Sequence, residues 1–500
     1  MISHFIIAFL VLCLPVLVEA KTLYVDNTGS CSDATSYVVN GSGARWCTIA
    51  RAAWGSTTYA SPNTGEAAQA GDTVLITSGT YWENGDTGGG RFSVSLNPAN
   101  SGTAGNLITF RGVGTVYVRL NGPGNALPAY RGAMIGCASV NYILWDHLII
   151  DDYYGGSTSD TGPVVFSNSN HCQLINSEVI AHPGDVSTGT YFHGYPVFDA
   201  NYRGISLEPD ANFTLIKNNK IHGFVSAAAG ILAYDSNDNV VEHNEVYGNK
   251  IGIYFKGLHV GKTMARNVVR FNLVHDNTHR GIQNESTSLS LVYQNVVLES
   301  GTACLYLGSL GGPDGDRWFN NTCVSTQTTM EGSVVVSGAT VPTGPRNSNI
   351  INNIFVGPSC TFCYPIYEND GGFNPVEQNI IFNRNLWFGN TTARHVNCCG
   401  NPSFTTWQAS PLLEDVDSIS GVSPLFMGSG NYKLQVGSPA RTLGRVIAEQ
   451  VTLGGFGLLG DTIPAGAYVT GSEVIGVETS GSTGTTISGG VTFSGSVSIQ

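Results

Sequence analysis

Four polar side chains recur at one position of a repeated segment, and they are of types that carry out acid–base chemistry. Glu208, Tyr234, Lys256 and Glu285 each lie three residues after the isoleucine of a Gly-Ile pair. The four pairs are Gly204-Ile205, Gly230-Ile231, Gly252-Ile253 and Gly281-Ile282. If each pair begins a strand, side-chain alternation turns the isoleucines inward and the polar residues toward solvent. The lysine then supplies a proton acceptor beside a tyrosine that can donate a proton.

Neighbouring positions extend this polar strip. The equivalent residues at its two ends are predicted to be Phe166 and Leu307, which would make the ends apolar. The adjacent column is predicted to hold Ser206, Leu232, Tyr254 and Gln283. Arg280 and His279 precede the last Gly-Ile pair, where they can bind a carboxylate or share the proton transfer.

The elements that position these residues form a degenerate repeat. An alternating segment that ends in Asn-X-aliphatic recurs at intervals of 23 to 32 residues, with its key asparagines at Asn219, Asn244, Asn272, Asn295, Asn321, Asn353 and Asn385. Weaker copies occur at Asp146 and Ser177. A unit this short cannot bury its apolar face alone, so it must stack on its neighbours. Asparagine suits each turn because its amide can bond the amides above and below and tolerates left-handed backbone.

The chain resembles the right-handed parallel β-helices of the pectate-lyase-like superfamily over residues 21–468. The resemblance rests on the repeats, on Leu23-Tyr-Val-Asp26 and Ala70-Gly-Asp-Thr-Val-Leu-Ile76 near the beginning, and on Gly437-Ser-Pro-Ala440 and Ala465-Gly-Ala-Tyr468 near the end. It implies an all-β solenoid with a short N-terminal cap helix within residues 27–70. The predicted domains are a signal peptide (1–20), the β-helix (21–470) and a Gly/Ser/Thr-rich low-complexity tail (471–500).

The resemblance implies that an outer sheet face binds an acidic polysaccharide. Similar chondroitinase-B-like and alginate-lyase-like enzymes use a lysine and an arginine from neighbouring coils together with calcium. A lyase is therefore expected, with Lys256 as the base and Tyr234 or Arg280 assisting. The predicted substrate-binding residues are Glu208, Tyr254, Gln283, His279 and Tyr202, and the predicted calcium ligands are Glu208 and Glu285. The insertion 182–202 contains Tyr191, His193, Tyr195 and Tyr202, which either stack on sugar or pack against one another.

Other interpretations remain open. The strip can be a solvated ladder of ion pairs, which contributes little free energy. A glycoside hydrolase needs two carboxylates about 5–9.5 Å apart, whereas Glu208 and Glu285 are three coils, about 14 Å, apart. Asp151, Asp152, Asp185 and Asp199 remain as loop carboxylates for such a reaction. A noncatalytic surface protein that binds glycans or assembles through its coils is the alternative from another class.

Composition and the N-terminus predict an extracellular monomer. Charged residues make up 12% of the chain and the net charge is −13, which argues against nucleic-acid binding. The apolar run 5–18 before Val18-Glu19-Ala20 is typical of a secretion signal and is too short to span a membrane.

The cysteines and sequons agree with secretion. Ten cysteines remain after Cys13 leaves with the signal, and an even number is typical of disulfides in an oxidising compartment. The predicted pairs are Cys31–Cys47, Cys137–Cys172 and Cys304–Cys323. Cys360, Cys363, Cys398 and Cys399 form a last group, with a zinc site as the alternative to disulfides. Sequons at Asn40, Asn212, Asn284, Asn320 and Asn390 are expected to carry surface sugars where the host glycosylates.

Overall fold

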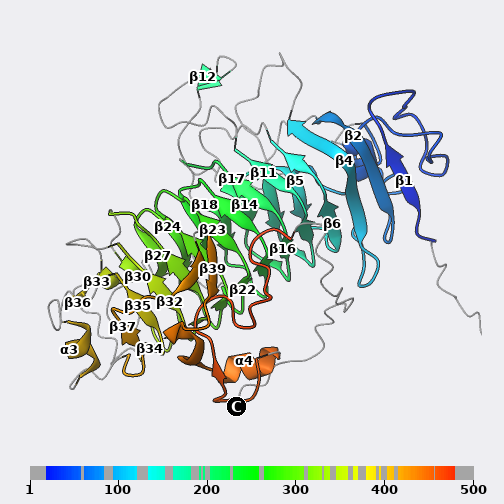
Figure 1. Cartoon of the computed structure of the whole chain (residues 1–500). Coiled ribbons are helices and arrows are strands. Elements are labelled where there is room, and N and C mark those ends of the chain that lie inside the picture. The colour runs from blue at the N-terminus through cyan, green and yellow to red at the C-terminus, as the bar shows by residue number, and fades with distance from the viewer. Residues whose placement is uncertain are drawn as a thin grey trace, which may run out of the picture.

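The repeats form the stacked coils of a parallel β-helix (Figure 1). The computed structural model describes residues 19–57, 61–83, 94–120, 133–151, 162–181, 191–192, 195–196, 203–225, 229–257, 264–308, 313–328, 332–337, 345–358, 364–369, 379–389, 394–395, 403–409, 415–428, 430–454 and 456–478. Each central coil contributes two short strands and one longer strand, and each strand pairs in parallel with its equivalents in the neighbouring coils. The predicted all-β solenoid is confirmed.

One sheet is built from the longer strands, and we call it the long-strand sheet. Its eleven strands are β3 (Val94–Leu96), β5 (Ala133–Ala138), β8 (Val164–Ser167), β14 (Arg203–Leu207), β18 (Ala229–Tyr234), β21 (Ile251–Lys256), β24 (Arg280–Glu285), β27 (Ala303–Gly308), β30 (Gly332–Ser337), β33 (Tyr364–Asn369) and β36 (Arg394–His395). Ile205, Ile231, Ile253 and Ile282 are paired in register along it and are fully buried, as predicted.

The other large sheet has 22 strands and supplies two faces. At its N-terminal end β1 (Thr22–Val25) pairs with β2 (Thr73–Glu83), which pairs with β4 (Ile108–Leu120); β4 in turn pairs with strands of both faces. The first face contains β6 (Ile143–Asp146), β10 (Gln173–Ile175), β16 (Leu215–Lys217), β19 (Val240–Glu242), β22 (Val268–Arg270), β25 (Leu291–Tyr293), β28 (Arg317–Phe319), β31 (Asn349–Ile351) and β34 (Ile381–Asn383). The second contains β7 (Ile149–Ile150), β11 (Glu178–Ile180), β17 (Lys220–His222), β20 (Glu245–Tyr247), β23 (Leu273–His275), β26 (Val296–Leu298), β29 (Thr322–Val324), β32 (Ile354–Val356), β35 (Leu386–Phe388) and β37 (Ile419–Ser420).

The predicted asparagine ladder runs along the corner between these two faces. From Asn219 to Asn385, each Nδ2 donates to the Oδ1 of the next asparagine at 3.0–3.1 Å, and all seven side chains are buried. Each Oδ1 after the first also accepts the backbone N–H of the preceding ladder residue, as at Asn244 and Asn272. Ser177 continues the ladder upstream because its N–H donates to Asn219 Oδ1.

Two details of the ladder differ from the sequence prediction. Asp146 is not a ladder residue: it ends β6 and forms an ion pair with Arg111 at 2.6 Å, and Leu148 takes the turn position that donates to Ser177. The left-handed backbone lies one residue before each ladder asparagine, at Asn218, Phe271 and Gln294 among others. Asparagine is therefore required at the ladder for its amide and not for its backbone conformation.

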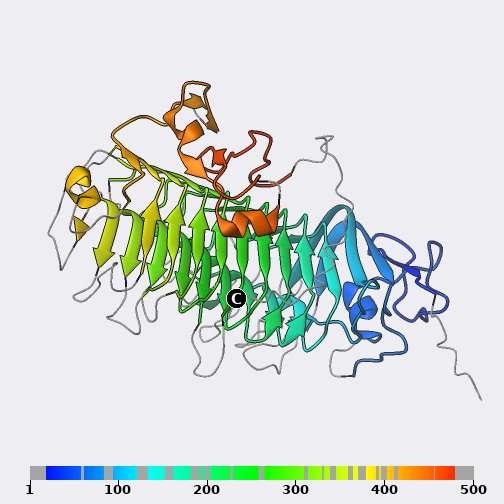
Figure 2. The ribbon, with the colours of Figure 1, turned by 90° about the horizontal axis from the view of Figure 1, so that it is seen from below.

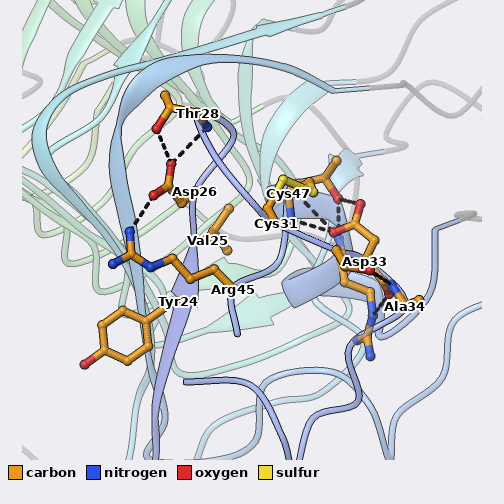
Figure 3. Close-up of a disulfide and its surroundings, with 12 residues drawn as sticks. Tyr24, Val25, Asp26, Thr28, Cys31, Asp33, Ala34, Arg45 and Cys47 are labelled. Carbon is orange, nitrogen blue, oxygen red and sulfur yellow. Dashed lines mark hydrogen bonds and ion pairs between the residues drawn. A yellow bond between two sulfur atoms is a disulfide. The ribbon is translucent and has the colours of Figure 1, made fainter. Parts of the chain in front are cut away.

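The N-terminal coil is closed by α1 (Ile49–Trp54), which confirms the predicted cap helix. Thr48 caps this helix, and the buried Glu83 carboxylate accepts the N–H groups of Ile49 and Ala50. The adjacent loop is held by the Cys31–Cys47 disulfide and by Asp26, which pairs with Arg45 (Figure 3). Burial raises the pKa of Glu83 to about 7, against the lowering effect of its two backbone donors.

All three predicted disulfides are present: Cys31–Cys47, Cys137–Cys172 and Cys304–Cys323. Cys360, Cys363, Cys398 and Cys399 lie outside the described residues, as does most of the predicted signal peptide. No helix in the described ranges is both long and apolar enough to span a membrane. Three of the sequon asparagines are buried with their amides in hydrogen bonds, so the expected surface sites are wrong at Asn40, Asn284 and Asn320.

The C-terminal segment returns along the solenoid and lies against the ladder corner (Figure 2). It contains the hairpin of β38 (Phe426–Gly428) and β39 (Asn431–Leu434), the 3-10 helix η1 (Pro439–Thr442), β40 (Gly444–Arg445), α4 (Ala448–Leu453) and β41 (Thr462–Ile463). The remaining elements are α3 (Phe404–Gln408) and the pairs β9 (Ser169–Asn170) with β15 (Ala211–Asn212) and β12 (Tyr191–Phe192) with β13 (Tyr195–Pro196). Residues 471–478, predicted as tail, contact the coils through Gly476 and Glu478.

We expect Asn272→Ala to lower the free energy of unfolding by about 2–5 kcal/mol, because it leaves buried amide groups unpaired at roughly 1–3 kcal/mol each. Urea denaturation measures this. Asn106→Ala, which removes an exposed asparagine side chain with one hydrogen bond at 3.4 Å, is the matched control and should change little. Equal effects of the two substitutions would show that the ladder does not hold the coils together.

The raised pKa of Glu83 predicts that part of the free energy of unfolding depends on pH. Its folded pKa of about 7 lies above the ordinary value of 4.5, so the stability that it contributes is lost as pH rises from 4.5 to about 7. Glu83→Gln cannot lose a proton, so the unfolding free energy of the wild type should fall relative to that of the variant over this range, by about 1.4 kcal/mol per pKa unit. Parallel curves in urea titrations from acid to neutral pH would contradict this assignment.

Candidate functional site

The predicted polar strip lies on the outer face of the long-strand sheet. Tyr234 pairs with Lys256 and Lys256 with Glu285, and Glu208 follows the Leu207–Ala233 pair, which sets it opposite Tyr234. The adjacent column of Ser206, Leu232, Tyr254 and Gln283 is also in register. The strip is therefore assembled from the strands as the sequence predicts.

The exposure of the strip differs from the prediction. Glu208 and Glu285 are each only 1% exposed and so do not face solvent, whereas Tyr234 and Lys256 are half-buried. The residues predicted for the two ends of the strip are also wrong by one position. Phe166 pairs with Leu207 and Leu307 pairs with Asn284, so both point into the core, and the strip continues through Ser167 and Gly308.

Sequence reasoning missed Arg203, which organises the first half of the site. Its guanidinium donates to Glu208 Oε1 at 2.8 Å, to Ser206 Oγ at 3.2 Å and to the Tyr234 hydroxyl at 2.9 Å. The guanidinium carbon also lies 4.5 Å from the Tyr234 ring centroid. Arg203 and Arg280 both precede a Gly-Ile pair, and this shared position is the signal that could have identified Arg203. The buried ion pair fixes the Tyr234 ring from below.

The second half of the site is a network around Glu285. The Tyr254 hydroxyl donates to Glu285 Oε2, and Gln283 Nε2 donates to the same oxygen at 3.3 Å. Arg280 Nη1 donates to Gln283 Oε1 at 2.7 Å, and its guanidinium stacks on the Tyr306 ring at 3.4 Å. Burial and the Glu285 carboxylate raise the pKa of Tyr254, so its hydroxyl stays protonated and remains a donor.

Lys256 is the member of the strip with the fewest internal partners. Within the described part of the chain its ammonium makes no hydrogen bond or ion pair, and its nearest ring contact is Tyr254, 5.7 Å from the centroid. Arg280 likewise makes no ion pair with a described residue. Both cations are half-buried, as is Tyr234. These three side chains are therefore the ones that can meet a ligand, while the buried residues beneath them hold their positions.

His279 lies beside this group. Burial, Arg280 and Lys250 lower its pKa to about 4, so the imidazole is neutral at neutral pH. A neutral imidazole can accept a hydrogen bond or a proton from a ligand.

The residues predicted to bind calcium do not fit a shared ion. Glu208 and Glu285 are separated by two intervening strands, which corresponds to about 14 Å at the usual strand spacing, and calcium ligands lie 2.3–2.6 Å from the ion. Glu208 is already neutralised by Arg203. No group of three acidic, histidine or cysteine residues that could hold a metal occurs among the described residues.

Several predicted residues cannot be placed. Tyr202 and most of the insertion 182–202 lie outside the described residues, as do Asp152, Asp185 and Asp199. Asp151 is described, and it forms a bidentate ion pair with Arg119. Its charge is therefore used within the fold.

The comparisons with known proteins identify the architecture. A family model described as "right handed beta helix region" matches residues 203–386, which contain the whole polar strip. Together with the parallel sheets, this match defines the chain as a right-handed parallel β-helix. The search of curated proteins found no match.

Solved structures similar to this chain include three lyases. They are a rhamnogalacturonan lyase (14% identity, 73% of this chain and 87% of that chain, TM-score 0.44), the pectate lyase Pel9A (12%, 90% and 96%, 0.43) and a PL6 family polysaccharide lyase from Pseudopedobacter saltans (13%, 74% and 93%, 0.43). Likeness at this level does not transfer a reaction or a substrate. The chemistry must be argued from the residues of this chain.

The unfolding free energies of alanine variants can distinguish the structural role of the buried residues from the ligand-binding role of the half-buried ones. Glu208→Ala should cost about 3–5 kcal/mol of unfolding free energy, because Arg203 would remain as an uncompensated buried charge. Lys256→Ala should stay within about 0.5 kcal/mol of wild type, since the ammonium has no described partner. Chemical denaturation of both variants measures the difference. A costly Lys256→Ala would make this lysine a structural residue.

Proposed function

We propose that the protein is a polysaccharide lyase that cleaves a uronate-containing polymer on the outer face of the long-strand sheet. The observation that supports this proposal is the placement of Lys256 and Arg280. These two cations make no ion pair with described residues, stand on neighbouring strands beside Tyr234, and belong to a chain of net charge −13. A polymer that carries one carboxylate on each sugar unit is the ligand that such cations attract.

Each half-buried residue has a role in β-elimination. Arg280 neutralises the uronate carboxylate, which makes the adjacent C5 proton more acidic. Lys256 in its neutral form accepts that proton, and the electron pair of the C5–H bond forms the C4–C5 double bond as the C4–O4 bond breaks. Tyr234 donates its phenolic proton to the departing O4. The two proton-transfer residues are one strand apart, about 4.8 Å along the solenoid axis.

The buried network makes this arrangement rigid. Arg203 holds the Tyr234 hydroxyl from one side, and Gln283 holds the Arg280 guanidinium through its amide oxygen. Preorganised charges of this kind stabilise a developing enolate without reorganising during the reaction. A glycoside hydrolase is less well supported, because both buried carboxylates of the strip accept hydrogen bonds from neighbouring side chains.

The proposal includes an extracellular location. Three disulfides are formed within the described part of the chain, and such bonds persist in oxidising compartments. Extracellular polysaccharide is also where a lyase meets its substrate. Detection of the protein in culture medium, with the signal removed, would test this part.

Lys256→Ala should reduce formation of unsaturated product ends by about 10²–10⁴-fold, the usual contribution of a general base. Wild type and variant are incubated with alginate, pectate, chondroitin and related polymers, with and without calcium, and the products are identified by mass spectrometry. Lys220→Ala, which removes an exposed lysine on β17 of the other large sheet, is the matched control and should keep full activity.

Two outcomes would contradict the proposal in different ways. Binding of a polymer without any product would favour the noncatalytic glycan-binding protein. Cleavage that survives Lys256→Ala unchanged would leave the reaction in place but move the base elsewhere.

A further inference from the structure

A second group of cations without a described ion pair lies in the C-terminal segment, which packs at the ladder corner. Lys433 of β39 and Arg441 of η1 line a cavity of about 220 Å³ together with Tyr468. Among the described residues neither cation makes an ion pair: Lys433 contacts the Tyr468 ring at 5.6 Å, and Arg441 reaches only the Leu434 carbonyl at 3.5 Å. The described residues that line the cavity include no acidic side chain.

A second cavity, near the N-terminus, contains for comparison an arginine whose charge is paired with a carboxylate. It has about 270 Å³ and is lined by Asp26 and Arg45, which form an ion pair at 2.5 Å (Figure 3). Arg45 also donates to the Ser42 carbonyl. That guanidinium is neutralised within the fold, so its cavity has no excess positive charge. The cavity lined by Lys433 and Arg441, in contrast, has excess positive charge.

Glu473 is an acidic side chain near the C-terminal cavity, and its oxygens are hydrogen-bonded away from the two cations. Burial and, after it, the Glu473 carboxylate raise the pKa of Tyr468, so this carboxylate lies near the tyrosine. Its oxygens accept the N–H groups of Thr470 and Gly471 and the amide of Gln294. Glu473 therefore holds the 470–473 turn against the coils and leaves the two cations free to bind an external anion.

The remaining lining fits a sugar ring better than a bare ion. Met427, Leu434 and Pro464 supply an apolar wall, and the Tyr468 phenol adds a polar edge. The volume is several times the roughly 30 Å³ that one water molecule occupies in the liquid, and it is smaller than sites for drug-sized ligands, which begin near about 300 Å³. A single sugar unit has an apolar face, hydroxyl groups and, when acidic, one anionic group.

We infer that this cavity binds one sugar unit that carries a carboxylate or a sulfate group, with Lys433 and Arg441 on the anion and the apolar wall against the ring. The site is separate from the proposed catalytic strip and does not depend on it. It would hold an acidic glycan on the C-terminal segment, whether or not the long-strand sheet cleaves that glycan.

The test is isothermal titration calorimetry on the full chain carrying both Lys256→Ala and Arg280→Ala, which removes the two cations of the first site. The probes are glucuronate, galacturonate, glucose 6-sulfate, their neutral parent sugars and inorganic sulfate. The acidic sugars should bind, and the neutral sugars should bind at least about tenfold more weakly, since a charge-assisted hydrogen bond contributes at this scale. The carboxylate and sulfate arms distinguish the two anionic groups.

Arg441→Ala and Lys433→Ala should each weaken binding of the acidic sugar by about tenfold or more. Arg445→Ala, a neighbouring arginine whose Nη1 contacts only backbone carbonyls, should leave the affinity within about twofold. Equal affinity for neutral and acidic sugars, binding of inorganic sulfate alone, or insensitivity to both substitutions would overturn the assignment. Circular dichroism spectra of the Lys433→Ala and Arg441→Ala variants check that each remains folded.

Discussion

The hydrogen bonds between equivalent asparagines of successive coils are the constraint on which the rest of the structure depends. Each ladder amide bonds the next side chain, and its oxygen also accepts the backbone N–H of the preceding ladder residue, as Asn272 does with Asn244. A slip of one residue in any coil would break several of these bonds and turn the buried side chains outward. The ladder thus fixes the register, and the register creates the columns of the outer faces.

The same corner also organises the C-terminal segment. The residue before each ladder asparagine has a left-handed backbone, and at Asn218, Phe271, Gln294, Asn320 and Asn352 this residue bonds the returning chain. The ladder side chains therefore make the hydrogen bonds inside the corner. The residues that precede them make the hydrogen bonds to the C-terminal segment on its outer side. The segment follows the solenoid because its hydrogen-bonding partners recur once in every coil. The cavity of Lys433 and Arg441 forms where this segment folds on itself.

Much of the fold follows from patterns that the sequence displays. Alternation and the Gly-Ile pairs predict the long-strand sheet correctly, because period 2 is the geometry of a strand. The position of Lys256 beside Tyr234 follows from that register alone. The three disulfides were also predictable, since each pair is close in sequence and the parallel coils bring them together.

The side-chain network of the site was not predictable in the same way. The bond from Arg203 to Tyr234 joins residues on neighbouring coils, and its geometry depends on how two long side chains lie on the sheet. The burial of Glu208 and Glu285 depends on what lies over the sheet, which alternation does not specify. The positions of Phe166 and Leu307 were predicted wrongly because β8 and β27 have no Gly-Ile pair to set the register. Sequence pattern thus predicts which strand a residue is on better than which partners it meets.

The pairing of charges within the fold indicates which cations are available to bind a ligand. Most arginines with described partners are bound to carboxylates, as Arg270 is to Glu242 and Arg266 to Asp238. In a chain with 36 acidic and 23 basic residues, an unpaired cation is not explained by a shortage of carboxylates. The net negative charge of the protein favours pairing of each cation with a carboxylate. A half-buried cation without such a partner loses part of its hydration free energy, and no interaction inside the fold compensates for that loss. An external anion can compensate for the lost hydration free energy, and this is the physical reason to expect ligands at Lys256 and at Lys433.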